Sequence, residues 1–96
     1  MYKPLPSNVT IKESKIHGFG LFAKEFIHKE TELGITHHFL EEQIIRTPLG
    51  GFYNHSEDPN CYSVIGAGMA TLVSLRGIEE GEELTVFYTI NPLPHP

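Results

Sequence analysis

Hydrophobic and polar residues alternate along this 96-residue chain in short segments, and turn residues interrupt them. Val9 and Ile11 alternate with Thr10 and Lys12, which is the period of two expected of a half-buried strand. A second apolar run, residues 70–76, contains β-branched residues and is bounded by glycine. This pattern predicts a small, mostly β domain made of short strands.

Near the end of the chain, residues 78–81 form a predicted tight connection between two strands. Gly81 can take a positive φ there, because it has no Cβ. The connection returns the chain into residues 83–88, so we expect a strand pair formed by 70–76 and 83–88.

Only residues 38–45 favour a helix. Their apolar side chains fall on roughly one side of a helical projection, and Pro48 would force the helix to end. Such a helix has two turns at most, which is marginal without tertiary packing. The expected fold class is therefore mainly β, with at most one short helix.

Composition narrows the class of protein. With 40% hydrophobic and 20% charged residues, the chain fits one globular domain, and it has no run of the roughly 18 apolar residues that a membrane span needs. A formal charge of −5 has the wrong sign for neutralising phosphates, so we expect no direct nucleic-acid binding and a basic protein or peptide as partner.

One cysteine, Cys61, excludes an intrachain disulfide framework. The first residues lack the apolar stretch of a signal peptide, so we expect an intracellular protein, cytoplasmic or nuclear. The histidines are scattered, and the adjacent His37 and His38 do not preorganise a metal site, so no metal is predicted. Four acidic residues, Glu79, Glu80, Glu82 and Glu83, are interpreted as a solvated turn.

Three segments are candidates for ligand binding or chemistry because of their residue types: 16–23, 54–61 and 81–88. The Gly-x-Gly at 18–20 lacks the third glycine of a dinucleotide-binding loop, and a tight turn between strands also explains it. Residues 54–60, Asn-His-Ser-Glu-Asp-Pro-Asn, also suit an Asx-type turn. Taken singly, each segment therefore has a purely structural interpretation.

Together and in this order, the segments resemble the SET domain of protein lysine methyltransferases. The resemblance rests on Gly-Phe-Gly-Leu-Phe-Ala at 18–23, on Asn-His-Ser-x-x-Pro-Asn at 54–60, and on Gly-Glu-Glu-Leu-Thr followed by a tyrosine at 81–88. It extends from about Val9 to Tyr88, within a single minimal domain spanning 1–96 with extended ends at 1–7 and 89–96. It implies a β-clip of short curved sheets whose C-terminal segment passes through a loop as a pseudoknot.

The resemblance also implies S-adenosylmethionine as cofactor, held by Gly18, Phe19, Gly20, Asn54 and His55. The glycines have a physical reason to lie there, because a backbone without Cβ atoms can approach a ligand closely. An asparagine side chain offers both a donor and an acceptor. The implied reaction is methyl transfer to a lysine of a protein substrate, in which positioning of the reactants dominates.

Tyr88 matches the family's catalytic tyrosine, with packing at a strand end as the alternative. Phe87 is expected to wall the lysine channel or the cofactor pocket, and many relatives carry an acidic residue at its position. Tyr53 is a further channel candidate, although core packing also explains it. The chain lacks the cysteine cluster that follows the domain in several subfamilies, so no zinc is expected there.

The segment between the first and second motifs is unusually short, which leaves little chain for a substrate groove. Two alternatives therefore stay open beside the enzyme: a noncatalytic SET-like module that binds a peptide or partner protein, and a β-clip binding domain of unrelated function. A homodimer in which a second subunit completes the pocket is also possible, as in small viral members of the family.

Overall fold

Strands dominate the computed structural model, which describes residues 5–87. In chain order, the strands and the single helix are β1 (Val9–Glu13), β2 (Phe19–Ala23), β3 (Glu32–Leu40), β4 (Gln43–Arg46), α1 (Pro48–Phe52), β5 (Asn54–His55), β6 (Cys61–Gly66), β7 (Met69–Ser74) and β8 (Glu83–Val86). Within the described part of the chain, the predicted mainly β fold with at most one short helix is confirmed. The predicted pseudoknot depends on the path of the C-terminal segment, of which residues 88–96 lie outside that part.

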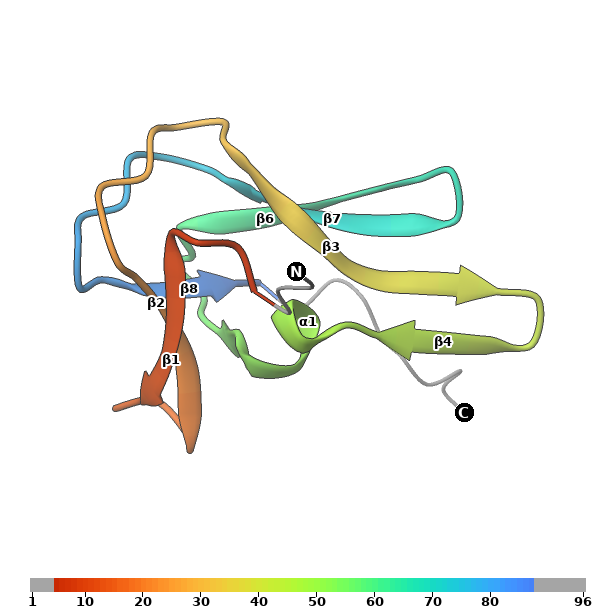
Figure 1. Ribbon diagram of the computed structural model, residues 1–96, viewed down its shortest axis with the longest axis horizontal. Coiled ribbons are helices and arrows are strands. Elements are labelled where there is room, and N and C mark those ends of the chain that lie inside the picture. Colours follow the sequence, from red (N-terminus) through yellow and green to blue (C-terminus); the bar gives the residue numbers. More distant parts are fainter. Residues whose placement is uncertain (1–4, 88–96) are drawn as a thin grey trace.

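The strands form a mixed sheet in the order β1-β2-β8-β6-β7-β3-β4, with β5 paired to β8 off this path. β8 is antiparallel to β2 and parallel to β5 and β6. The β1–β2 hairpin crosses one end of the molecule, while the β6–β7 and β3–β4 hairpins extend away from it in the same direction (Figure 1). β8 therefore lies where the first, second and third sequence motifs meet.

The helix predicted over residues 38–45 is wrong. These residues form the end of β3, a turn and β4, with Phe39 paired to Ile44 and His38 paired to Ile45. Two of the apolar residues that suggested one helical face, Phe39 and Ile44, are cross-strand neighbours. The β-branched residues Ile44 and Ile45 favour a strand. A helix of only two turns without capping residues is too short to be stable against that preference.

The observed helix, α1, instead begins at Pro48, the residue expected to end a helix. Thr47 is the N-cap of α1, its hydroxyl accepting from the Gly50 N–H at 3.2 Å, and Pro48 occupies the first turn. Proline suits this position because its missing N–H would have no partner there in any case.

The predicted pairing of the strand at 70–76 with the strand at 83–88 is also wrong. β7 pairs with β3 and β6, whereas β8 pairs with β2, β5 and β6, so the two strands are not neighbours. Gly81 does have a positive φ of 87°, as predicted. The connection therefore carries the chain across to β2 rather than back along β7.

Buried apolar side chains from most strands and from α1 form one core between the sheet and the helix. Its members are Val9, Leu21, Ala23, Ile27, Leu33, Leu49, Cys61, Leu72, Ile78, Leu84 and Val86. No helix in the described residues is long and apolar enough to cross a membrane.

Candidate functional site

The first motif forms the turn of the β1–β2 hairpin. The Ser14 N–H donates to the Gly18 carbonyl at 2.7 Å, and the Ser14 hydroxyl oxygen accepts from the Ile16 N–H at 2.9 Å. Gly18 has a φ of 48°, in the left-handed region that favours glycine. The loop is therefore folded around the side chain of Ser14.

Asn54, at the start of β5, ties the second motif to this loop. Its side chain is 7% exposed, and Nδ2 lies 3.3 Å from the carbonyl oxygens of both His17 and Phe19. Nδ2 also donates to Glu83 Oε2 at 2.8 Å and lies 3.2 Å from Ser14 Oγ. One amide thus joins the first, second and third motifs.

Glu83 completes the junction. Its carboxylate accepts from the Ser14 hydroxyl at 2.8 and 2.9 Å, and it fills the space beside Gly20, where an added Cβ would lie only 2.2 Å from Oε2. Sequence reasoning missed Ser14 as a site residue and placed Glu83 in a solvated turn. The signal available for both was their position inside or beside the motifs.

The other predicted cofactor residues lie next to this junction. His55 is paired with Val86, and its ring lies 4.9 Å from the Phe87 ring, centroid to centroid. Phe19 and Phe87 are 58% and 50% exposed, so two aromatic rings face solvent beside the junction. The structure thus brings Gly20, Phe19 and Asn54 together, with His55 and Phe87 alongside.

Tyr53 and Tyr88 are the remaining two predicted site residues. Tyr53 packs against the core, and its ring lies 6.5 Å from that of the buried His37. Burial, followed by the charge of Arg46, lowers the pKa of His37, so its ring is neutral at pH 7. Tyr88, the predicted catalytic residue, lies outside the described residues.

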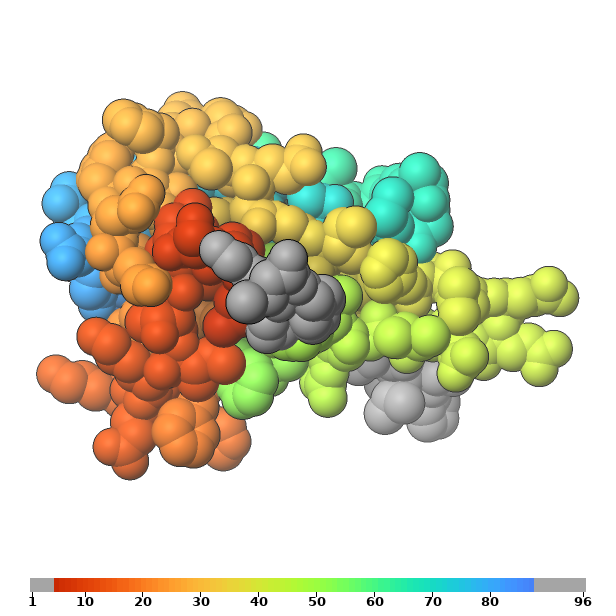
Figure 2. All heavy atoms as spheres, viewed as in Figure 1, coloured from red at the N-terminus to blue at the C-terminus, as the bar shows by residue number. Residues whose placement is uncertain are grey.

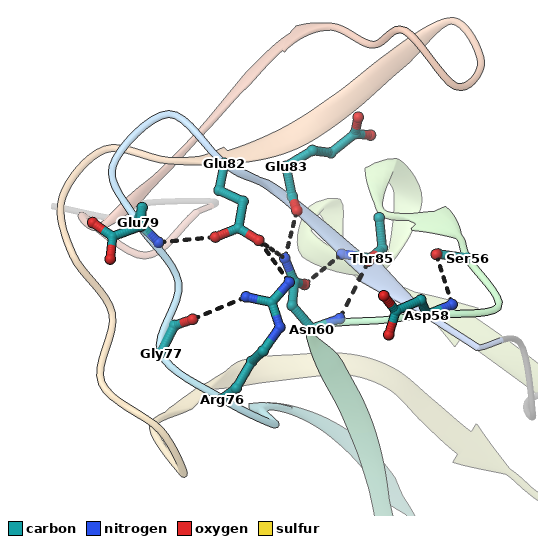
Figure 3. A network of polar contacts seen from close by, with 9 residues as sticks. All are labelled: Ser56, Asp58, Asn60, Arg76, Gly77, Glu79, Glu82, Glu83 and Thr85. Atoms are coloured by element: carbon teal, nitrogen blue, oxygen red, sulfur yellow. Dashed lines mark hydrogen bonds and ion pairs between the residues drawn. The ribbon is translucent and has the colours of Figure 1, made fainter.

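The last residue of the second motif, Asn60, holds the backbone of the third motif (Figure 3). Its Nδ2 donates to the Glu83 carbonyl at 2.7 Å and its Oδ1 accepts from the Thr85 N–H at 2.8 Å. Asn60 is 2% exposed, so these bonds are shielded from water. β8 is therefore held by Asn60 through its backbone and by Asn54 through the side chain of Glu83.

Glu82 extends this network to the surface. It accepts from Arg76 Nη2 at 2.8 Å and from the Glu79 N–H at 3.0 Å (Figure 3). Burial alone would raise the pKa of Glu82, but the hydrogen bonds from Arg76, Glu79 and Asn60 lower it below its usual value. The predicted solvated turn is thus correct for Glu79 and Glu80, which are exposed, and wrong for Glu82 and Glu83.

Cys61 follows Asn60 directly and is 1% exposed. Burial raises the pKa of its thiol to about 12, although the charge of Arg76 opposes the shift. We expect the native protein not to react with a thiol-specific chromogenic reagent at pH 8, and the protein in denaturant to react with one equivalent. Rapid labelling of the native protein would contradict the burial of this side chain.

The SET domain family model matches residues 36–89, which is more than half of the chain and includes the second and third motifs. The protein belongs to the SET domain family. Among curated protein sequences there is no significant match.

Solved structures extend the similarity of this SET domain to the first motif. A candidate histone methyltransferase of Plasmodium falciparum is 21% identical with a TM-score of 0.72, over 88% of this chain and 95% of that one. The methyltransferase domain of human PR domain-containing protein 2 is 18% identical with a TM-score of 0.73, over 96% and 84%.

A larger assembly contains the same fold. One chain of Polycomb Repressive Complex 2 of Chaetomium thermophilum, in a structure bound to the inhibitor GSK126, is 20% identical with a TM-score of 0.73. The match covers 94% of this SET domain and 17% of that chain. At these identities the similarity establishes a common fold.

Proposed function

We propose that the protein is an S-adenosylmethionine-dependent methyltransferase that acts on a lysine of a basic protein or peptide. The observation that carries this proposal is the junction at Asn54, where one side chain amide contacts the first and third motifs of the family. A junction at which three segments distant in sequence meet is typical of a ligand site held by a fold. The fold shared with methyltransferase structures supports the same function.

The residues at the junction fit the cofactor chemically. The Asn54 amide has two N–H groups but lies near four acceptors, which are Ser14 Oγ, the His17 and Phe19 carbonyls, and Glu83 Oε2. The surplus acceptors and the charge of Glu83 favour a cationic ligand, and S-adenosylmethionine carries a sulfonium and an ammonium group. The exposed rings of Phe19 and Phe87 offer apolar surface for an adenine.

When bound, the cofactor supplies a methyl group activated by its positive sulfur. In the proposed reaction Gly18, Phe19, Gly20, Asn54 and His55 hold it in place. The lysine amine must lose its proton before it attacks, because only the neutral amine has a free electron pair. Tyr88 is proposed to align that amine through its hydroxyl, with Phe87 and Tyr53 lining the channel.

Titration calorimetry with S-adenosylmethionine, followed by transfer of a radiolabelled methyl group to lysine-rich peptides, tests the proposal. We expect binding that Asn54→Ala weakens at least tenfold, and transfer that Tyr88→Phe lowers by about 10²-fold with little change in cofactor affinity. Absence of binding at millimolar cofactor would refute the proposal. Full activity of Tyr88→Phe would remove Tyr88 from its role, and binding without transfer to any peptide would favour the noncatalytic module.

A further inference from the structure

β4 is an edge strand with an unusually open outer side. All four of its residues are exposed, and it follows the two glutamates Glu41 and Glu42 at the tip of the β3–β4 hairpin. Within residues 5–87, only β3 pairs with it. The hairpin projects beyond the body of the molecule (Figure 2). A projecting edge with free backbone groups is a template for pairing with another strand.

The hydrogen bonds of the hairpin decide which residues of β4 face outward. The Thr47 N–H donates to the Thr36 carbonyl at 2.9 Å, so Thr47 points its backbone groups toward β3. Backbone direction alternates along a strand, and Ile45 therefore also points toward β3. Ile44 and Arg46 consequently present their N–H and C=O groups to the outside.

We propose that β4 pairs in antiparallel fashion with β4 of a second copy of this chain, about a twofold axis through Ile44. Outward residues must face outward residues for such a pair to form hydrogen bonds. The register centred on Ile44 satisfies this condition for Ile44 itself, and it brings Glu42, in the turn just before β4, next to Arg46 of the other copy. A register centred on Ile45 would instead place Ile44 against Arg46 and Glu42 against Pro48, which has no N–H to donate.

Side chain chemistry favours the same register. Ile44, 36% exposed, lies beside its cross-strand partner Phe39, so the two copies would form a continuous apolar strip Phe39–Ile44–Ile44–Phe39. An opposite charge pair would flank this strip on each side, as a self-complementary twofold contact requires. A contact of about five residues per copy buries less than the roughly 1,200 Å² of a stable complex. The dimer is therefore weak and depends on concentration.

Charge reversal with a matched control tests the pairing by sedimentation equilibrium of the full chain without cofactor. We expect a monomer–dimer equilibrium whose dissociation constant rises about tenfold in Glu42→Arg and returns to within about threefold of wild type in Glu42→Arg/Arg46→Glu. Glu41→Arg changes the net charge equally but does not face Arg46, so it should shift the constant by less than about threefold.

A wild-type chain that stays monomeric at millimolar concentration would overturn the proposal, as would equal effects of Glu41→Arg and Glu42→Arg. A monomer whose β4 is covered by a lysine-containing peptide would assign this edge to a substrate instead. Since no cofactor or activity is needed, failure here is distinct from failure of the methyltransferase proposal.

Discussion

Gly50→Ala is expected to destabilise the protein by about 3 kcal/mol or more. A Cβ at this position would lie 2.2 Å from the Thr36 carbonyl oxygen and 2.9 Å from the carbonyl carbon. Backbone atoms cannot rotate away, and Thr36 is held by a hydrogen bond from Thr47 and is fully buried. α1 would have to separate from β3, which is a large change against a total stability of about 5–15 kcal/mol.

The adjacent glycine provides the control. An added Cβ at Gly51 meets no atom within 4 Å, so Gly51→Ala should be neutral or slightly stabilising in the helix. Urea unfolding of both variants, followed by circular dichroism, measures the difference. Similar midpoints for Gly50→Ala and Gly51→Ala would show that α1 does not pack against Thr36 as described.

Local signals in the sequence predicted local features correctly. The alternation from Val9 to Lys12 predicted β1, and the glycine at 81 predicted a positive φ. The pattern failed where neighbours distant in sequence decide the outcome. Residues 38–45 have an ambiguous short apolar pattern, and they form strands because β3 is already paired with β7 up to His38 and β4 then pairs with β3.

In the candidate site, too, the residues carried by local sequence motifs could be predicted, and the contacts between distant residues could not. Gly18, Phe19, Gly20, Asn54 and His55 could be predicted because the family motifs carry them. Ser14 and Glu83 lie beside and inside these motifs, but their contact could not be predicted, since it joins residues 69 positions apart and depends on β8 lying beside β2. Nor does the chain's composition indicate which of its acidic residues are exposed and which are hydrogen-bonded.

The topology explains why β8 organises the site. A strand with neighbours on both sides carries backbone contacts to β2, β5 and β6, so it aligns three motif segments at once. Asn60 fixes its backbone, and Asn54 and Ser14 fix the side chain of Glu83. A short domain thereby obtains a rigid junction without a long insert.

Glu83→Ala is expected to weaken S-adenosylmethionine binding at least tenfold. The substitution removes the acceptor for the Ser14 hydroxyl and for the Asn54 amide, two hydrogen bonds to a charged group that contribute about 1.5–3 kcal/mol each. The loop at 14–19 then loses its anchor to β8. Titration calorimetry gives the affinity, and hydrogen exchange of the Ile16 and His17 amides reports whether the loop opens.

A graded series separates the charge of Glu83 from its shape. Glu83→Gln keeps one oxygen that can accept from Ser14 but removes the negative charge, so it should retain the protected loop and lose part of the affinity for a cationic cofactor. Glu80→Ala, at an exposed glutamate of the same turn, should leave both quantities unchanged. If Glu83→Gln and Glu83→Ala weaken binding equally while the loop stays protected in both, the charge of Glu83 rather than its anchoring of the loop determines cofactor affinity.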